Sequence, residues 1–296
     1  MVGAFDWCQL ALLPGTIDME ILLISLMLGA VTGLILGLTG AGGAIVAIPL
    51  LIFGLNLPMT QAAPVALLAV ALSATIAAFL AFSRLKIVRY RAAGLIAVLG
   101  TVIAPFGVWV AQFLPNLLLT LLFVMVLAYV SWRMFRTASL QEMPEKCTSP
   151  DTAPCQFDTV KGRLIWNEPC AKALALAGVI TGFLSGLLGV GGGFVIIPAI
   201  KRATTLPMQS LVATSLAAIA LISTVGFLSA AFIGTMQWAI AVPFATGAVS
   251  GMLIGRRYAD RFNETLLQRS FAVIAGCIAL GMLVNTITVG VKTLFA

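Results

Sequence analysis

A glycine-rich motif occurs twice in this chain and contains the residues best suited to contact a ligand. The first copy runs from Gly37 to Pro49 and the second from Gly186 to Pro198, with identical residues at eight of thirteen positions. Each copy interrupts a long apolar segment, resumes it and then meets a proline. In a soluble protein, glycines at this spacing after a strand can bind a dinucleotide phosphate. Here both flanks are apolar over membrane length, which favours an interrupted membrane helix repeated in each half.

Both copies contain a run of glycines that is too dense for a continuous helix, because each glycine costs about 1 kcal/mol relative to alanine. Backbone groups left unpaired inside a bilayer are tolerated only where protein or a water-filled cavity surrounds them. A tight turn at the membrane surface is the alternative, but the arms that follow are too short to begin at the far face. Helices that restart at Ala44 and Phe194 would direct free N–H groups into the breaks, and helix N-termini bind anions without lysine or arginine.

Hydroxyl groups are the polar side chains available inside the apolar segments, at Thr39, Ser73, Thr75, Ser185, Thr214, Ser215, Ser223 and Thr224. A single hydroxyl in a membrane helix more often bonds its own backbone, but Thr75 and Thr224 occupy equivalent positions in the two halves. We predict a substrate site at the breaks, where two inverted repeats would meet. Its predicted members are Thr39, Gly40, Gly42, Gly43, Thr75, Gly189, Gly191, Gly192, Gly193 and Thr224.

No residue pattern in the sequence predicts catalysis, a metal site or a cofactor. The chain has no histidine, and its five cysteines are scattered. Cys147 and Cys155 share a polar stretch, where a cytoplasmic location would disfavour a disulfide. Intramembrane carboxylates are the usual proton relays, but acidic residues are absent from the middle of the apolar segments. The polar groups that remain are suited to binding rather than to acid–base or nucleophilic chemistry.

The composition is that of a polytopic membrane protein. Of 296 residues, 61% are hydrophobic and 9% are charged, with a mean hydropathy of +1.11, whereas soluble domains carry about 25% charged residues. The net charge of +7 comes from basic residues at the ends of apolar segments, where they anchor cytoplasmic loops. The expected partner is therefore the lipid bilayer and not nucleic acid. Residues 1–16 contain no lysine or arginine, so we expect no cleaved signal peptide.

Ten apolar segments fall into two groups of five, separated by one polar stretch. Segments of about 20 residues can span a bilayer, whereas the two short ones after the glycine breaks cannot; these are expected to be second arms of hairpins or second halves of broken helices. The polar stretch 137–170 is predicted to be a cytoplasmic linker between membrane units 17–136 and 171–290. The apolar segments are 17–38, 44–55, 62–83, 92–113, 117–132, 172–188, 193–200, 208–231, 239–255 and 268–290.

The two membrane units are related by a constant offset of 149 residues. Residues 29–75 and 178–224 align without a gap and share 19 identities in 47 positions. Chance similarity of apolar sequences does not align glycines and prolines in register, so we infer an internal duplication. The predicted fold class is an all-α polytopic membrane protein with two inverted-topology repeats. Each repeat would contain a glycine-broken helix or re-entrant hairpin and three transmembrane helices.

Loop charges predict that the two repeats are inverted. The loop 84–91 carries four basic residues, whereas the equivalent loop near 233–238 carries none. The sign of the bias reverses for two further loop pairs, in which Arg256, Arg257 and Arg261, and Lys201 and Arg202, have uncharged equivalents. Because basic loops remain in the cytoplasm, one loop of each pair should lie inside and the other outside. Both termini are then predicted outside, and Lys292 is the one charge that conflicts.

Three further sets of glycines recur at every fourth residue, at 29, 33 and 37, at 178, 182 and 186, and at 247, 251 and 255. On a helix, this spacing makes a smooth face that allows a neighbouring backbone to approach closely. We expect these nine glycines to pack helices together rather than to bind a ligand.

The duplicated break, Gly40 to Pro49 and Gly189 to Pro198, with Pro58 and Pro207 downstream, resembles the TauE/SafE family of sulfite and sulfonate exporters. The resemblance covers almost the whole chain except the 137–170 stretch. It implies export of small sulfur-containing anions, such as sulfite or sulfoacetate, across a bacterial inner membrane. The first copy departs from the second in having Ala44 where the second has Gly193, which leaves open whether both breaks contact substrate equally.

Three functions compete at this stage. An anion transporter is favoured, driven by the membrane potential or coupled to protons. A channel would need a continuous polar face, and these segments show only scattered hydroxyls. An intramembrane enzyme would need a nucleophile or base, and the sequence shows no Ser-His arrangement, carboxylate pair or metal cluster. The sequence leaves the identity of the anion and the oligomeric state open.

Overall fold

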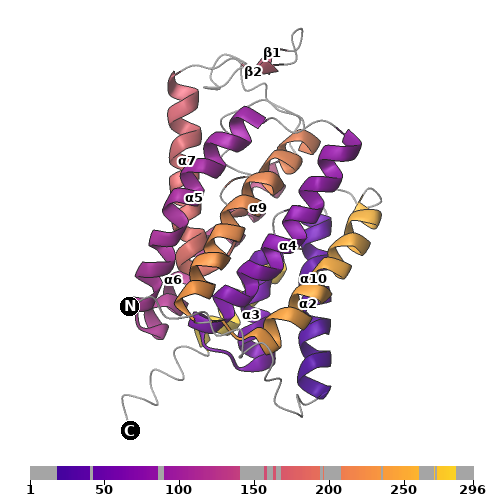
Figure 1. The fold of residues 1–296 in the computed structure, drawn as a ribbon, viewed down its shortest axis with the longest axis vertical. Coiled ribbons are helices and arrows are strands. Elements are labelled where there is room, and N and C mark those ends of the chain that lie inside the picture. The colour runs from indigo at the N-terminus through magenta and orange to yellow at the C-terminus, as the bar shows by residue number, and fades with distance from the viewer. Residues whose placement is uncertain are drawn as a thin grey trace.

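The computed structural model describes residues 19–40, 43–85, 90–140, 157–158, 163–164, 168–193, 196, 208–234, 236–259, 270 and 272–284. These residues form a bundle of long helices (Figure 1), seven of which are long and apolar enough to cross a membrane. The first half contains α2 (Met19–Thr39), α3 (Gly43–Leu55), α4 (Met59–Leu85), α5 (Tyr90–Phe113) and α6 (Asn116–Leu140). The second half contains α7 (Glu168–Leu188), α9 (Met208–Ile233), α10 (Trp238–Ala259) and a shorter helix, Ala272–Val284.

The polytopic helical architecture predicted from the sequence is confirmed. Four of these helices contain a proline within them, at Pro49, Pro64, Pro105 and Pro243. Membrane helices tolerate internal prolines because neighbouring helices and side chains satisfy the freed backbone groups. Hydropathy and length therefore outweighed the helix-breaking tendency of proline.

The polar stretch between the halves adds a small element that the all-α prediction did not include. β1 (Phe157–Asp158) and β2 (Arg163–Leu164) pair as antiparallel strands, with Phe157 opposite Leu164. The expected cytoplasmic location of the polar stretch disfavours a disulfide between Cys147 and Cys155. Both residues lie outside the described ranges. The structure instead records a disulfide at Cys170, at the start of α7, with a cysteine that is also outside those ranges.

Two helix pairs pack backbone to backbone through the regularly spaced glycines. Gly29 and Gly33 of α2 lie against the carbonyl groups of Phe244 and Ala248 in α10, and α10 returns the contact through its own glycines. In the same way, Gly182 of α7 lies directly on the backbone of α5. Contact this close favours association in a membrane, where apolar side chains gain little by leaving lipid. The predicted packing role of the nine glycines is confirmed.

The order of these contacts fixes the relative directions of the helices. Successive glycines along α2 meet successive turns of α10, so the two helices are parallel, and the same holds for α7 and α5. By contrast, α4 and α9 are antiparallel, because Ala81 packs with Ala213 whereas Leu67 lies beside Gly226. Figure 1 shows α4 and α9 side by side between the α2–α10 pair and the α5–α7 pair.

Helix α3 folds back along α2 and does not continue it. A side chain added at Gly43, where α3 begins, would meet Leu36 and Thr32, and one added at Gly54 would meet Leu28. The two helices therefore form an antiparallel hairpin. With 13 residues, α3 is about 20 Å long, which is shorter than the hydrocarbon core of about 30 Å. Of the two arrangements that the sequence left open, the first half adopts the hairpin.

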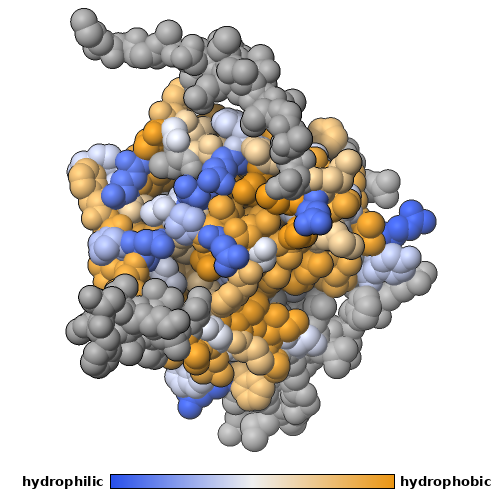
Figure 2. All heavy atoms as spheres, turned by 90° about the horizontal axis from the view of Figure 1, so that it is seen from below, coloured by the Kyte–Doolittle hydropathy of each residue, from blue (hydrophilic) through white to orange (hydrophobic). Residues whose placement is uncertain are grey.

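The two ends of the bundle differ in chemistry. One end, here called the basic end, carries Arg133 and Arg136 of α6, Lys172 of α7, and Arg256 and Arg257 of α10. The opposite end, here called the amide end, carries Asn56, Gln61, Gln112, Asn116 and Gln237. Figure 2 looks at the bundle from below in the view of Figure 1 and shows separate hydrophilic patches within a largely hydrophobic surface. Because basic loops are retained in the cytoplasm, we expect the basic end to face inward.

Candidate functional site

The first glycine break separates α2 from α3, and its first residue packs closely against an apolar side chain. Gly40 has a φ of 75°, and a side chain added there would meet Val212 of α9 at 2.5 Å. Just before it, the hydroxyl of Thr39 donates to the carbonyl of Ile35. Gly43 begins α3, within one residue of the predicted restart at Ala44. Gly42, which belongs to the predicted site, lies outside the described residues.

The second break follows α7 and is one residue longer. Gly189, Gly191 and Gly192 all have φ values between 66° and 73°, a conformation that glycine adopts without strain. The N–H of Gly189 donates to the carbonyl of Ser185, which closes the last turn of α7. Helical structure resumes at Gly193, and the N–H of Ile196 donates to the carbonyl of Gly192. The break thus comprises residues 189–192, against 40–42 in the first half.

Each break starts against the first turns of the central helix from the other half. Gly40 lies on Val212 of α9, and Gly189 lies on Ala63 of α4; Ala63 and Val212 are equivalent positions in the repeat. Because α4 and α9 are antiparallel, these two contacts are at opposite ends of the pair. The separation from Ala63 to Ala81, which packs with Ala213, is about 27 Å along α4.

Gly191 occupies the middle of the α4–α9 pair. A side chain added there would lie 2.9 Å from Val70 of α4, 3.6 Å from Ile219 of α9 and 3.0 Å from the hydroxyl of Ser223. Val70 and Ile219 are themselves equivalent positions in the repeat. The second break therefore extends from the amide end to the centre of the bundle, where the sequence predicted a binding site.

Four buried hydroxyl groups lie on the three helices, α4, α7 and α9, that contact this inner part of the second break. Ser223 faces Gly191, and Thr181 of α7 lies directly against Gly192. Ser185 is one turn beyond Thr181 on α7, and Ser73 is one turn beyond Val70 on α4, so each shares a helix face with its neighbour. Within the described part of the chain, the oxygens of Ser73, Thr181, Ser185 and Ser223 have no hydrogen-bond partner.

The four other buried hydroxyl residues of the described chain do not share this lack of partners. Ser25, Thr32 and Ser215 are also buried, and each donates to a carbonyl of its own helix. An unsatisfied buried polar group costs about 1–3 kcal/mol. Four such groups near one another therefore indicate a place where a polar guest is accommodated.

The two threonines predicted from the repeat are placed differently. Thr75 lies on an exposed face of α4 and donates to the carbonyl of Ala71, while half-buried Thr224 donates to that of Ala220. The atoms nearest to Gly191 and Gly192 belong to Val70, Ile219, Ser223 and Thr181. The structure thus brings Ser223 and Thr181 to Gly191 and Gly192, but it places neither Thr75 nor Thr224 among the nearest contacts of these two glycines.

The predicted members Thr75 and Thr224 recur in both halves, and each bonds its own helix rather than contacting Gly191 or Gly192. Ser73, Ser185 and Ser223 count among the available hydroxyls of the sequence but are not predicted members of the site. Thr181 lies among the packing glycines of α7 and does not stand out in the sequence. The signal that could have found it is its spacing: Thr181 and Ser185 are four residues apart, directly before the break, and so lie on one face of the helix.

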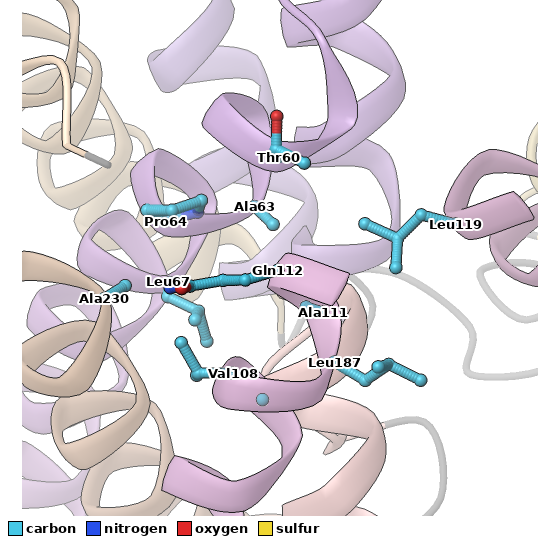
Figure 3. Close-up of a pocket in the computed structure, with 11 residues that line it drawn as sticks. Thr60, Ala63, Pro64, Leu67, Val108, Ala111, Gln112, Leu119, Leu187 and Ala230 are labelled. Carbon is cyan, nitrogen blue, oxygen red and sulfur yellow. The ribbon is translucent and has the colours of Figure 1, made fainter. Parts of the chain in front are cut away.

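A cavity of about 40 Å³ lies next to the second break on the side of the amide end. Its wall includes Ala63, Pro64 and Leu67 of α4, Val108 and Gln112 of α5, and Gly186 and Leu187 of α7. Figure 3 shows these helices around it, with Gln112 among the few polar side chains of the lining. This volume has room for about three water molecules, so in this conformation the cavity is too small for an organic anion.

Polar contacts hold the structure at both ends of the central helices. At the amide end, the side-chain amide of Gln237 donates to the side-chain oxygen of Gln61 at 2.9 Å. At the basic end, the guanidinium of Arg256 donates to the carbonyl of Ala77 at 2.7 Å, and the backbone of Arg256 lies beside Gly37, just before the first break. The basic end, where the first break starts, therefore holds a positive charge against α4, and the second break is close to the hydroxyl of Ser223.

Comparison with known proteins supplies the family context. The family model described as "Sulfite exporter TauE/SafE" matches residues 25–282. The chain is 32% identical to a "Probable membrane transporter protein" of Xylella fastidiosa (strain 9a5c), over 88% of this chain and 94% of the relative. It is 26% identical to the "Probable membrane transporter protein YunE" of Bacillus subtilis (strain 168), over 86% of this chain and 95% of that protein. No solved structure matches the chain significantly.

Proposed function

Because this chain belongs to the TauE/SafE family of membrane transporters, we propose that it exports small sulfur-containing anions such as sulfite or sulfoacetate across the bacterial inner membrane. The observation that carries the proposal is the second glycine break, which places Gly191 between α4 and α9 beside the unpartnered hydroxyl of Ser223. Hydroxyl and amide donors suit an anion, and the described central segments contain no carboxylate that would repel one.

We further propose that the chain consists of two inverted repeats, 17–136 and 171–290, joined by a cytoplasmic linker at 137–170. Supporting observations are the antiparallel arrangement of α4 and α9 and the exchange of contacts between halves, in which α2 packs on α10 and α7 on α5. Equivalent helices run in opposite directions when a repeat is inverted. Binding near the bilayer midplane at the interface of the repeats is the usual arrangement in transporters of this kind.

In the proposed mechanism, the anion passes between the two breaks and contacts their backbone N–H groups, those of Gly42 and Gly43 and those of Gly192 and Gly193. Thr39, Gly40, Gly189, Gly191, Thr75 and Thr224 complete the set predicted from the sequence. Transport would require movement of the α4–α9 region, because the cavity beside the second break holds only a few waters. The Gln61–Gln237 hydrogen bond would open on the outward side during this movement.

The membrane potential suffices to drive export of an anion. A negative interior pushes each negative charge outward with about 2.3 kcal/mol per 100 mV, equivalent to a gradient of roughly 40-fold. A proton relay through intramembrane carboxylates is then unnecessary, in agreement with the uncharged middle of the predicted segments. We therefore propose potential-driven uniport rather than proton coupling.

The proposal is tested with purified protein in liposomes, using sulfite, sulfoacetate, taurine, sulfate and lactate. A potassium gradient with valinomycin sets the membrane potential while pH is equal on both sides. We expect flux of sulfite or sulfoacetate that reverses direction with the sign of the potential. Flux that ignores the potential and follows an imposed pH gradient would contradict uniport, and transport of lactate alone would contradict the substrate class.

The orientation is tested by cysteine labelling from each side of the membrane. Val88 and Thr235 lie outside the described residues, in the connections between α4 and α5 and between α9 and α10. In a background without native cysteines, we expect a cysteine at 88 to react only from the cytoplasm and one at 235 only from outside. Labelling of both positions from the same side would rule out the inverted repeat.

A further inference from the structure

Three helices that pack against the second break carry buried hydroxyl groups: α4 carries Ser73, α7 carries Thr181 and Ser185, and α9 carries Ser223. Their side-chain oxygens are fully buried and have no partner among the described residues. The hydroxyl of Ser223 lies against Gly191, and the side-chain methyl of Thr181 lies against Gly192. Ser223 and Thr181 therefore flank a single dipeptide from two helices, and Ser73 and Ser185 lie one turn from its contacts Val70 and Thr181.

The repeat does not duplicate this cluster. The positions equivalent to Ser73, Ser185 and Ser223 are occupied by Ile222, Leu36 and Ala74. The fourth equivalent, Thr32, keeps its hydroxyl, but that hydroxyl donates to the carbonyl of Gly29. The contacts of Gly40 and Gly189 follow the repeat, whereas the equivalents of the four unpartnered hydroxyls offer no free hydroxyl in the described part of the chain.

We infer that this transporter has one principal binding site for its anion, formed by Ser73, Thr181, Ser185 and Ser223 around Gly191 and Gly192. The inference rests on the proposed anion transport and deepens it, because it assigns binding to the second glycine break. The first break then contributes only backbone N–H groups along the path of the anion.

The ligand that fits this cluster is an oxyanion with several acceptor oxygens on one small group, such as sulfite or a sulfonate. Rotatable hydroxyls on three helices can each donate to a different oxygen. The described residues place no lysine or arginine in this cluster. Binding by neutral donors is strong enough to replace part of the hydration shell and weak enough to allow release, as conduction and transport require. A ligand that also carries an ammonium group, such as taurine, would form no additional favourable contact with that group in this cluster.

Buried water is the alternative occupant of such a cluster. The two occupants are distinguished by replacing hydroxyls with groups of similar shape. Removing a buried hydroxyl that has no protein partner should leave folding intact, because no internal hydrogen bond is lost. A cluster that holds only water would therefore tolerate Thr181→Val and Ser223→Ala without any change in anion binding.

The test compares Thr181→Val, Ser223→Ala and the double variant with Thr32→Val and Ser229→Ala. The last two are matched controls, whose hydroxyls donate to the carbonyls of Gly29 and Val225 in their own helices. Sulfite and sulfoacetate are the probes, and two quantities are measured: the KM for flux in proteoliposomes and the anion-dependent shift of Tm in detergent. We expect each site variant to raise KM about tenfold, since hydrogen bonds to a charged acceptor are stronger than neutral ones, and to reduce the Tm shift. The controls should change KM less than twofold.

The outcomes separate this inference from the function on which it rests. If the wild-type protein transports and binds the probes and the double variant does so equally well, the site assignment is wrong while the anion transport stands. If Thr32→Val weakens binding as much as Thr181→Val, the claim of a single site is wrong. If no probe is transported and none shifts Tm in the wild type, the proposed function fails, and the site fails with it.

Discussion

The two glycine breaks share an origin in sequence and differ in what surrounds them. Both begin against the first turns of the opposite central helix, Gly40 on Val212 and Gly189 on Ala63. In the described residues, Gly40 of the first break meets the side chain of Val212, whereas Gly191 of the second lies against the hydroxyl of Ser223, which has no partner. Duplication thus preserved the backbone geometry that brings a break into the bundle, and divergence of a few side chains made the two breaks chemically unequal.

The largest expected effect comes from the packing glycines, which bring helices into backbone contact in both halves. A side chain at Gly33 would run into the backbone of Ala248, and one at Gly182 into that of Gly100. Backbone cannot move aside as a side chain can, so Gly33→Leu and Gly182→Leu should each abolish folded protein. Size-exclusion chromatography of detergent extracts should show less than about one tenth of the wild-type monodisperse peak, given an overpacking cost of several kcal/mol.

Gly94 provides the matched control, because no atom lies within 4 Å of a side chain added there. Gly94→Leu should be extracted at nearly the wild-type level. Gly33→Leu and Gly182→Leu proteins that fold normally and only bind substrate less tightly would show that these glycines act in binding rather than in packing.

The breaks themselves should differ in how they respond to a single methyl group. Gly40→Ala places its methyl 2.5 Å from a side-chain atom of Val212, whereas Gly189→Ala meets the backbone of Ala63, its Cα at 2.5 Å and its carbonyl oxygen at 2.8 Å. Both also incur the strain of a positive φ, about 1–2 kcal/mol. We expect Gly189→Ala to lower flux more than tenfold and Gly40→Ala to lower it about threefold, measured per folded protein in liposomes.

Second-site changes sharpen this difference. Val212→Ala removes the group that Gly40→Ala would strike, so the double variant should recover at least half of the wild-type flux. Ala63→Gly removes only the methyl group and leaves the Cα and carbonyl in place, so it should not rescue Gly189→Ala. Equal rescue at both breaks would mean that their surroundings are functionally equivalent.

The helices were predictable from the sequence because hydropathy, length and glycine density are local properties. The segments 62–83 and 92–113 correspond to α4 and α5, and the break before α3 was placed within one residue. The choice between a hairpin and a broken helix was not local, because it depends on whether Gly43 meets Leu36 and Thr32 of the preceding helix. Contacts with partners distant in the sequence, such as the α5–α7 pair, required the folded structure.

The candidate site was predictable in part, for a related reason. The dense glycines predict a break in the helix. However, α4 and α9 are apolar around most of their circumference, so the sequence pattern does not show which face of each helix is buried. Recurrence in the repeat pointed to Thr75 and Thr224, which bond their own helices. Of the four hydroxyls without partners, three do not recur, and the recurring one, Thr181, has an equivalent in Thr32 that bonds its own helix.

The smallest expected effect concerns the charge near the first break. The half-buried guanidinium of Arg256 is tied to the carbonyl of Ala77, while Arg257 beside it in sequence is exposed. If the basic end faces the cytoplasm, Arg256 raises the local concentration of anions at the inner entrance, an effect on rate that salt screens over about 10 Å at 0.1 M. Arg256→Gln should therefore lower the initial rate of sulfite flux about threefold at low ionic strength and hardly at all at high ionic strength, while Arg257→Gln should change it less under both conditions. A decrease in the initial rate that persists unchanged at high salt would indicate that Arg256 acts by packing α10 against α4. The charge near the first break would then play no electrostatic part in transport, in contrast to the hydroxyls near the second break.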